Sequence, residues 1–216
     1  MPTNVKICGL STPETVEAAL ASGADLIGFV FYPKSPRNVS VATAKALARI
    51  ARGKAKIVAL IVDADDTLID EITGEVAPDF FQAHGAETPA RIAEISRLSG
   101  KPVIKAIKVR TDADVVRAKA YESVAALILF DAKAPETLAG ALPGGNGIAF
   151  DWTLVGSGGA PSSFILSGGL DPDNVARAIE ATGAGIVDVS SGVEKSPGIK
   201  DINLIREFVA AAKAAP

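Results

Sequence analysis

Short apolar runs alternate with longer segments of helical periodicity along almost the whole chain. The runs are rich in branched residues and have no polar alternation, which is typical of strands buried on both faces of a parallel sheet. They predict eight strands, at residues 5–8, 26–31, 56–62, 80–84, 103–109, 126–130, 164–167 and 186–189.

The segments between these runs carry helix signals. Ser11 followed by Glu14 matches a capping box, and Pro13 suits a first helical turn. Ser40 and Thr88 are placed to cap the helices after the second and fourth strands. Residues 112–121 have the thinnest apolar face of the predicted helices. The last helix, residues 201–212, is expected to bury Ile202, Ile205, Phe208, Val209 and Ala212.

One long Pro- and Gly-rich loop is predicted over residues 132–147, and a short irregular helix is expected to open at 150–152. No linker or low-complexity tract interrupts the alternation of strands and helices. Such alternation favours a parallel sheet with right-handed crossovers. We therefore predict an α/β fold, a single-domain (β/α)8 TIM barrel over residues 1–216, near the lower size limit of that fold. A doubly wound open sheet is the alternative, but it usually has fewer strands at this length.

Charge and composition narrow the possible partners. The formal net charge is −3, so no global basic field exists to hold nucleic acid or an anionic membrane. No apolar segment reaches transmembrane length and the first residues lack a leader pattern, so we expect a cytoplasmic protein. Cys8 is the only cysteine and His84 the only histidine. The sequence therefore predicts no internal disulfide, no metal site and no cofactor.

Small residues follow the last two predicted strands. Gly168 and Gly169 come after the seventh strand, and Ser190 and Ser191 come after the eighth. Backbone N–H groups at such residues can approach an anion without a bulky side chain in the way. In a TIM barrel these two loops are the usual phosphate site. The position of the turns therefore predicts an enzyme that acts on a small phosphorylated molecule. No Walker-type motif is present.

Three residues near strand ends could carry chemistry. A lone cysteine is most often a small buried hydrophobe, but Cys8 ends the first strand before a glycine turn, where a thiolate base could act. Asp131 ends an apolar strand, where it is either a helix cap, a partner for Lys133 or a general acid. Arg37 is either a solvated loop residue or a residue whose planar guanidinium binds a carboxylate. His84 could stack on or bond to a substrate or simply pack, and we favour packing.

Several longer segments strengthen this interpretation. They are KICGL (6–10), GADLIGFVFYPKSPRNV (23–39), FFQAHGAE (80–87), IKAIKV (104–109), LILFDAK (127–133), GGNGIAFDW (144–152), LSGGLDPDNV (166–175) and VDVSSGVEKSPGIKD (187–201). In this order the chain resembles the phosphoribosylanthranilate isomerases of tryptophan synthesis. Ala83, Asn146 and Ser167 depart from the usual pattern of that family, and none of them is a proposed catalytic group.

The resemblance implies an Amadori rearrangement of N-(5-phosphoribosyl)anthranilate to 1-(2-carboxyphenylamino)-1-deoxyribulose 5-phosphate. It implies that Asp131 is the general acid that opens the ribose ring, that Cys8 is the general base that removes the C2′ proton, and that Arg37 holds the anthranilate carboxylate. It also implies phosphate binding around Gly168, Gly169, Ser190 and Ser191, and contacts of Asp188 and Gln82 with ribose hydroxyls. The protein is expected to be a monomer or a homodimer.

Other interpretations stay open at this point. An aldolase or an indoleglycerol phosphate synthase on the same barrel calls for a lysine at a strand end, and Lys105 is the candidate. A phosphometabolite sensor would keep the glycine and serine turns but would need neither Cys8 nor Asp131. A related phosphoribosyl substrate of histidine synthesis shares the phosphoribosyl amine core and is a possible second substrate.

Overall fold

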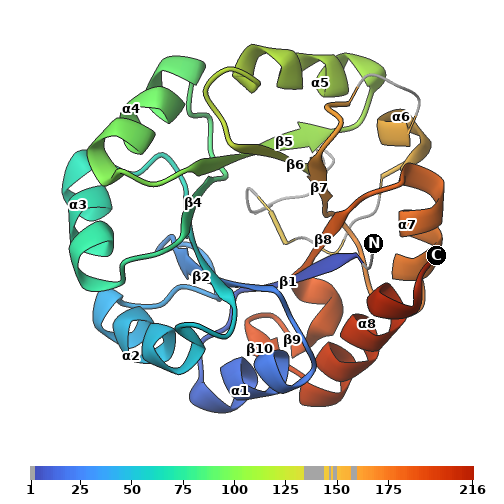
Figure 1. Ribbon diagram of the computed structural model, residues 1–216, viewed down its shortest axis with the longest axis horizontal. Helices are drawn as coiled ribbons and strands as arrows, with labels where there is room; N and C mark the ends of the chain where they lie inside the picture. The colour runs from blue at the N-terminus through green and yellow to red at the C-terminus, as the bar shows by residue number, and fades with distance from the viewer. Residues whose placement is uncertain (1–2, 134–143, 146, 148–149, 157–159) are drawn as a thin grey trace.

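Eight parallel strands form a closed barrel in which each strand pairs with the next and β8 pairs with β1. The computed structural model describes residues 3–133, 144–145, 147, 150–156 and 160–216. Figure 1 looks down the barrel, with the helices arranged around its outside. The prediction of a (β/α)8 barrel is confirmed.

The strands lie close to the predicted runs. They are β1 (Asn4–Cys8), β2 (Leu26–Phe31), β3 (Lys56–Ile61), β4 (Phe80–Ala83), β5 (Val103–Val109), β6 (Leu127–Ala132), β7 (Phe164–Leu166) and β8 (Ile186–Val189). The α-helices are α1 (Pro13–Ala21), α2 (Val41–Ala51), α3 (Asp66–Glu75), α4 (Pro89–Ser99), α5 (Asp112–Val116), α6 (Thr153–Gly156), α7 (Val175–Thr182) and α8 (Ile202–Ala214).

Most helix starts follow the predicted caps. The hydroxyls of Ser40 and Thr88 accept the N–H groups of Thr43 and Arg91, as a cap should. The predicted cap at Ser11 is wrong by one residue, because the Thr12 hydroxyl accepts the N–H of Thr15 at 3.3 Å instead. With Thr12 as the cap, Pro13 falls at the first helical position, where its missing N–H costs nothing.

Four other details differ from the predicted elements. Residues 112–121 split into α5 and a 3-10 turn, η1 (Arg117–Tyr121), as their thin apolar face suggests. Strand β6 continues to Ala132, so Asp131 lies within it. The short helix near residue 150 is α6, which begins at Thr153, and Ile202 is only partly buried. The predicted loop over residues 132–147 falls largely outside the described residues.

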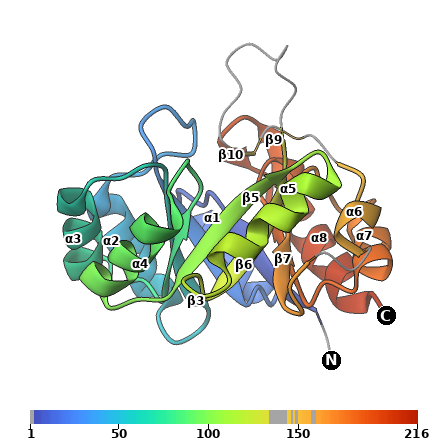
Figure 2. The same ribbon diagram turned by 90° about the horizontal axis from the view of Figure 1, so that it is seen from above.

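A segment after β8 was not predicted. It holds a 3-10 turn, η2 (Ser191–Val193), and an antiparallel hairpin of β9 (Glu194–Ser196) and β10 (Ile199–Lys200). In Figure 2 this hairpin lies on the side of the barrel opposite the two chain ends. It therefore stands at the mouth formed by the carboxyl ends of the strands.

Alternation along each strand separates two apolar layers. One set of side chains points outward and packs between the barrel and the helices, which is the main core. The other set fills the barrel interior and consists of Leu26, Val58, Ile104, Ala106, Leu129 and Ile165. Both faces of every strand are thus buried, which explains the continuous apolar runs. None of the helices within the described ranges is long and apolar enough to cross a membrane.

A buried ion pair joins the first and last strands inside the barrel. Lys6 on β1 and Asp188 on β8 are register partners, and Lys6 Nζ donates to Asp188 Oδ1 at 2.7 Å. Asp188 Oδ2 also accepts the Ser167 hydroxyl at 3.0 Å. Burial opposes the charge of Lys6, but the charge of Asp188 holds the pKa of Lys6 above its ordinary value. Lys6 therefore keeps its charge at neutral pH.

The interior apolar layer yields a stability prediction. Leu129→Ala would leave a cavity in the middle of the barrel, because Leu129 is fully buried there. We expect the free energy of unfolding to fall by about 2–5 kcal/mol. Val116→Ala on α5 is the control, since Val116 is 50% exposed, and its effect should stay within about 0.5 kcal/mol. Urea unfolding of both variants measures the difference, and equal effects would contradict the assignment of this layer as core.

Candidate active site

A pocket opens at the mouth of the barrel. Its walls come from the carboxyl ends of the strands and the loops that follow them, which is where TIM-barrel active sites lie. Eight residues predicted from the sequence line it: Cys8, Arg37, Asp131, Gly168, Gly169, Asp188, Ser190 and Ser191. The fold thus brings together groups that are spread over most of the chain.

Cys8 is the last residue of β1 and is 3% exposed. It faces the interior beside Val30 and Leu60. Its register partner is Gly28, and a Cβ at that position would lie 2.9 Å from the thiol sulfur. The missing side chain of Gly28 therefore makes room for the thiol. Burial raises the pKa of Cys8, and the nearby Lys6 ammonium offsets only part of that increase.

Asp131 lies at the end of a polar chain from β4. Its Oδ2 is 3.1 Å from His84 Nε2, and its Oδ1 accepts the backbone N–H of Ala132 at 2.9 Å. His84 Nδ1 is in turn 3.0 Å from the Gln82 amide nitrogen. Because that amide nitrogen is a donor, the network assigns the His84 proton to Nε2, where it is donated to Asp131. His84 also lines the pocket, so it is placed where it could contact a ligand as well as pack.

Gln82 itself does not line the pocket. Its side chain is fully buried beneath His84. Its amide oxygen has no hydrogen-bond partner among the described residues. In this arrangement Gln82 is linked to the pocket through His84. The direct contact of Gln82 with a ribose hydroxyl stays a prediction.

The turn after β7 depends on glycine. Gly168 and Gly169 have φ values of 86° and 66°, which are left-handed conformations that favour glycine. A Cβ on Gly168 would lie 2.5 Å from the backbone nitrogen of Ala132. The turn therefore packs closely against the end of β6. Beside it, the Ser190 hydroxyl donates to the carbonyl oxygen of Cys8 at 3.1 Å.

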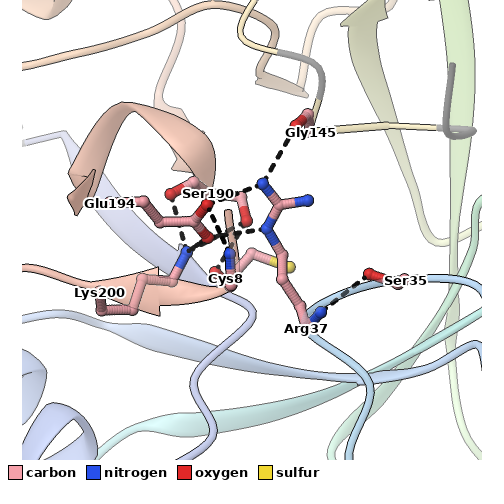
Figure 3. A network of polar contacts seen from close by, with 8 residues as sticks. Cys8, Ser35, Arg37, Gly145, Ser190, Glu194 and Lys200 are labelled. Carbon is pink, nitrogen blue, oxygen red and sulfur yellow. Dashed lines mark hydrogen bonds and ion pairs between the residues drawn. The ribbon is translucent and has the colours of Figure 1, made fainter. Parts of the chain in front are cut away.

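Arg37 is not a solvated loop residue, because it is 5% exposed. Its Nε and Nη2 atoms donate to the two carboxylate oxygens of Glu194 at 2.7 and 2.9 Å. Nη2 also donates to the carbonyl oxygen of Gly145 at 3.1 Å. Figure 3 shows this network, in which the guanidinium lies between Glu194 and Gly145.

A thiol, a carboxyl, a guanidinium and glycine turns thus meet at one barrel mouth. The family model of N-(5′phosphoribosyl)anthranilate (PRA) isomerase matches residues 5–211. The chain belongs to this family.

Individual PRA isomerases agree closely with the chain. The N-(5′-phosphoribosyl)anthranilate isomerase of Rhodopseudomonas palustris (strain BisA53) is 53% identical over 214 residues, which is 99% of this chain and 97% of the relative. A crystal structure of phosphoribosyl anthranilate isomerase from Thermotoga maritima superimposes with a TM-score of 0.87 at 36% identity, covering 98% of both chains. A PRA isomerase in complex with reduced 1-(O-carboxyphenylamino)-1-deoxyribulose 5-phosphate gives a TM-score of 0.84 at 34% identity, again over 98% of both chains.

Lys105, the residue required by the lysine-dependent alternatives, lies away from the mouth. Its neighbours Ile104 and Ala106 face the barrel interior, so Lys105 faces the helices. There its ammonium pairs with Glu87 at 2.7 Å and lies 5.7 Å from the centre of the Tyr121 ring. An active-site role for Lys105 as a Schiff-base former or acid is therefore wrong for this PRA isomerase family member.

Several site residues were missed from the sequence. Lys6 carries a charge inside an apolar strand, which is the same signal that singled out Asp131. Glu194 and Lys200 flank a Pro-Gly turn, which is a hairpin signal. Gly28 carried no signal, because a lone glycine in a strand has many possible reasons. Within the described part of the chain, no group of three or more His, Cys, Asp and Glu side chains could hold a metal ion.

The environment of Cys8 predicts its reactivity. Alkylation requires the thiolate, and burial raises the pKa of Cys8 above that of an ordinary thiol. The rate of alkylation by iodoacetamide should therefore still rise with pH where that of a free thiol has levelled off. Cys8 is the only cysteine, so the label reports on one site. The same protein in urea is the control. If the pH midpoint of the alkylation rate in the folded protein lay at or below that of the urea control, the charge of Lys6 would outweigh the effect of burial on the pKa.

Proposed function

We propose that this protein converts N-(5′-phosphoribosyl)anthranilate to 1-(2-carboxyphenylamino)-1-deoxyribulose 5-phosphate by general acid–base catalysis. The observation that supports this most is the pairing of Cys8 on β1 with Asp131 on β6 in one pocket. An Amadori rearrangement needs one acid and one base around a single sugar. These two groups are of the required kinds and come from separate parts of the barrel wall.

In the first step Asp131 gives its proton to the ring oxygen of the ribose. The bond from C1′ to that oxygen breaks, and the nitrogen lone pair forms a double bond to C1′. The ring oxygen becomes a hydroxyl group and the substrate becomes an open-chain protonated Schiff base. His84 holds Oδ2 of Asp131 through the contact of 3.1 Å, which keeps the carboxyl directed into the pocket.

In the second step the thiolate of Cys8 removes the proton from C2′. The electrons of the C2′–H bond form the C1′=C2′ bond of an enolamine, and the C1′=N electrons return to nitrogen. Protonation at C1′ and loss of the proton from the C2′ hydroxyl give the ketone. Because burial raises the pKa of Cys8, the thiolate is a stronger base than that of an ordinary thiol.

The two anionic ends of the substrate provide the positioning. Arg37 would bind the anthranilate carboxylate, and the turns at Gly168, Gly169, Ser190 and Ser191 would bind the phosphate. Asp188 would contact a ribose hydroxyl between them. Binding at both ends holds C2′ and the ring oxygen near their catalytic groups, which lowers the entropic part of the barrier.

We also propose a cytoplasmic location, since the reaction takes a small phosphorylated metabolite, and a monomer or homodimer in solution. A phosphoribosylanthranilate isomerase of Thermotoga maritima is described as dimeric.

Replacement of the two proposed catalytic groups tests the mechanism. Cys8→Ser and Asp131→Asn should each lower kcat by about 10²–10⁴-fold, since each removes one proton-transfer group. The assay follows the loss of fluorescence of phosphoribosylanthranilate made in situ. Both variants should still bind the reduced product analogue. Near-full activity of either variant would contradict the assigned role, and an inactive wild-type protein that binds phosphate would favour a sensor.

His84 allows a separate test of how Asp131 is held. His84→Ala removes the donor to Asp131, and we expect kcat to fall about 10-fold, the loss typical of one charge-assisted hydrogen bond. His84→Gln keeps an N–H donor and should restore part of kcat. The affinity for inorganic phosphate serves as the control, because the side chain of His84 bonds to Gln82 and Asp131, which are not part of the phosphate turns. An equal loss of phosphate affinity would indicate a general structural defect instead.

A further inference from the structure

We propose that Glu194 is a positioning residue for substrate recognition: it holds the guanidinium of Arg37 so that Nη1 meets the carboxylate of the substrate. This inference rests on the proposed function, because it assumes that Arg37 binds the aromatic carboxylate. Glu194 belongs to the β9–β10 hairpin, which follows the last strand of the barrel. Figure 3 shows the side chains involved.

The carboxylate of Glu194 is fully occupied by the protein. Oε1 accepts Arg37 Nε at 2.7 Å and Lys200 Nζ at 2.8 Å. Oε2 accepts Arg37 Nη2 at 2.9 Å and the backbone N–H of Gly198 at 3.1 Å. A carboxylate has about four lone-pair positions, so Glu194 has none left for a ligand.

Burial raises the pKa of Glu194, but the bonds from Arg37 and the charge of Lys200 outweigh this and hold the pKa below its ordinary range. Glu194 is therefore a fixed anion.

Arg37 keeps its Nη1 group for the ligand. Nε and one N–H of Nη2 donate to Glu194, and the second N–H of Nη2 donates to the carbonyl oxygen of Gly145. In Figure 3 the dashed lines from the guanidinium lead to these two residues, and Arg37 lines the pocket. Nη1 can therefore donate to a carboxylate of the ligand. Glu194 thus determines which part of the guanidinium the ligand meets.

Two glycines leave space for this orientation. A Cβ on Gly9 would lie 2.8 Å from Arg37 Cδ, and a Cβ on Gly145 would lie 2.6 Å from Arg37 Nη1. Arg37 is thus enclosed by close packing at its stem and at its head. Such packing reduces the side-chain entropy that would be lost on binding.

Lys200 connects this network to the phosphate end of the pocket. Its ammonium donates to Glu194, to the Ser190 carbonyl oxygen at 2.7 Å and to the Ser190 hydroxyl at 3.2 Å. The same hydroxyl donates to the carbonyl oxygen of Cys8. Burial lowers the pKa of Lys200 to about 8, although the charge of Glu194 raises it. Glu194 therefore separates two cations, Arg37 and Lys200, that would otherwise repel each other.

The hairpin is docked onto the loop that carries Arg37. Gly198 has a φ of 82°, and a Cβ there would lie 2.5 Å from the carbonyl oxygen of Pro36. Glu194 and Lys200 are register partners across the hairpin. The hairpin thus brings both charged residues to Arg37 from one rigid element.

The test compares two ligands in the full-length protein. One is the reduced product analogue, and the other is its anilino counterpart, which lacks the carboxylate. The ratio of their dissociation constants measures recognition of the carboxylate alone. In Glu194→Gln we expect this ratio to fall about 10-fold, equivalent to the loss of about 1.4 kcal/mol. KM for the substrate should rise by more than kcat falls. In an Arg37→Met background, Glu194→Gln should leave the ratio unchanged.

The control is Glu87→Gln. Glu87 lies on the loop after β4, and its carboxylate is similarly buried and paired with Lys105. Glu87→Gln should lower thermal stability without changing the ratio.

If Glu194→Gln does not fold, Glu194→Asp keeps the charge but shortens the side chain, and the ratio should fall less. An unchanged ratio would overturn the inference. A raised ratio would also overturn it, because Glu194 would then compete with the ligand for Arg37. If the wild-type protein itself shows no preference for the carboxylated ligand, the assigned role of Arg37 fails instead.

Discussion

The ion pair between Lys6 and Asp188 lies at the point where the barrel closes. These residues are register partners on the first and last strands, so their contact requires the two ends of the sheet to meet in one alignment. A shift of one residue in either strand would turn its charged residue toward the apolar layer outside, and the other charge would be left inside the barrel without its partner. The same alignment brings the end of β1 beside the end of β8, where the hydroxyl of Ser190 reaches the carbonyl of Cys8. The geometry of the pocket therefore depends on barrel closure.

Strand alternation separates the residues that stabilise the barrel from those that meet a ligand. Outward positions form a large apolar core against the helices, and inward positions form a smaller apolar layer lower in the barrel. Toward the mouth the inward positions become polar or small, as with Cys8, His84, Asp131 and Ser167. The polar groups there are bonded to one another. His84 donates to Asp131, and Arg37 forms an ion pair with Glu194.

The sequence predicted the barrel well because strands buried on both faces must be continuous apolar runs. Cys8 and Asp131 could be located because strand ends are the only positions that reach the mouth. The cap of α1 was misplaced because Ser11 and Thr12 are both good caps, and only the local backbone decides between them. The role of Glu194 could not be found, since its partner Arg37 lies 157 residues away in the sequence and the hairpin that carries Glu194 is an insertion between the last strand and the last helix. Contacts of this kind depend on tertiary structure, which no local pattern encodes.

The arrangement of Arg37, Glu194 and Lys200 has an evolutionary consequence. Each side chain satisfies hydrogen bonds of another in a place where water has little access. No single replacement keeps both the charge balance and the hydrogen bonds, so an accepted change at one position has to be accompanied by a change at another. Across a set of homologous sequences, the three positions should be invariant or vary jointly. The hairpin and the loop after β2 are therefore expected to evolve as one unit, even though they lie near opposite ends of the chain.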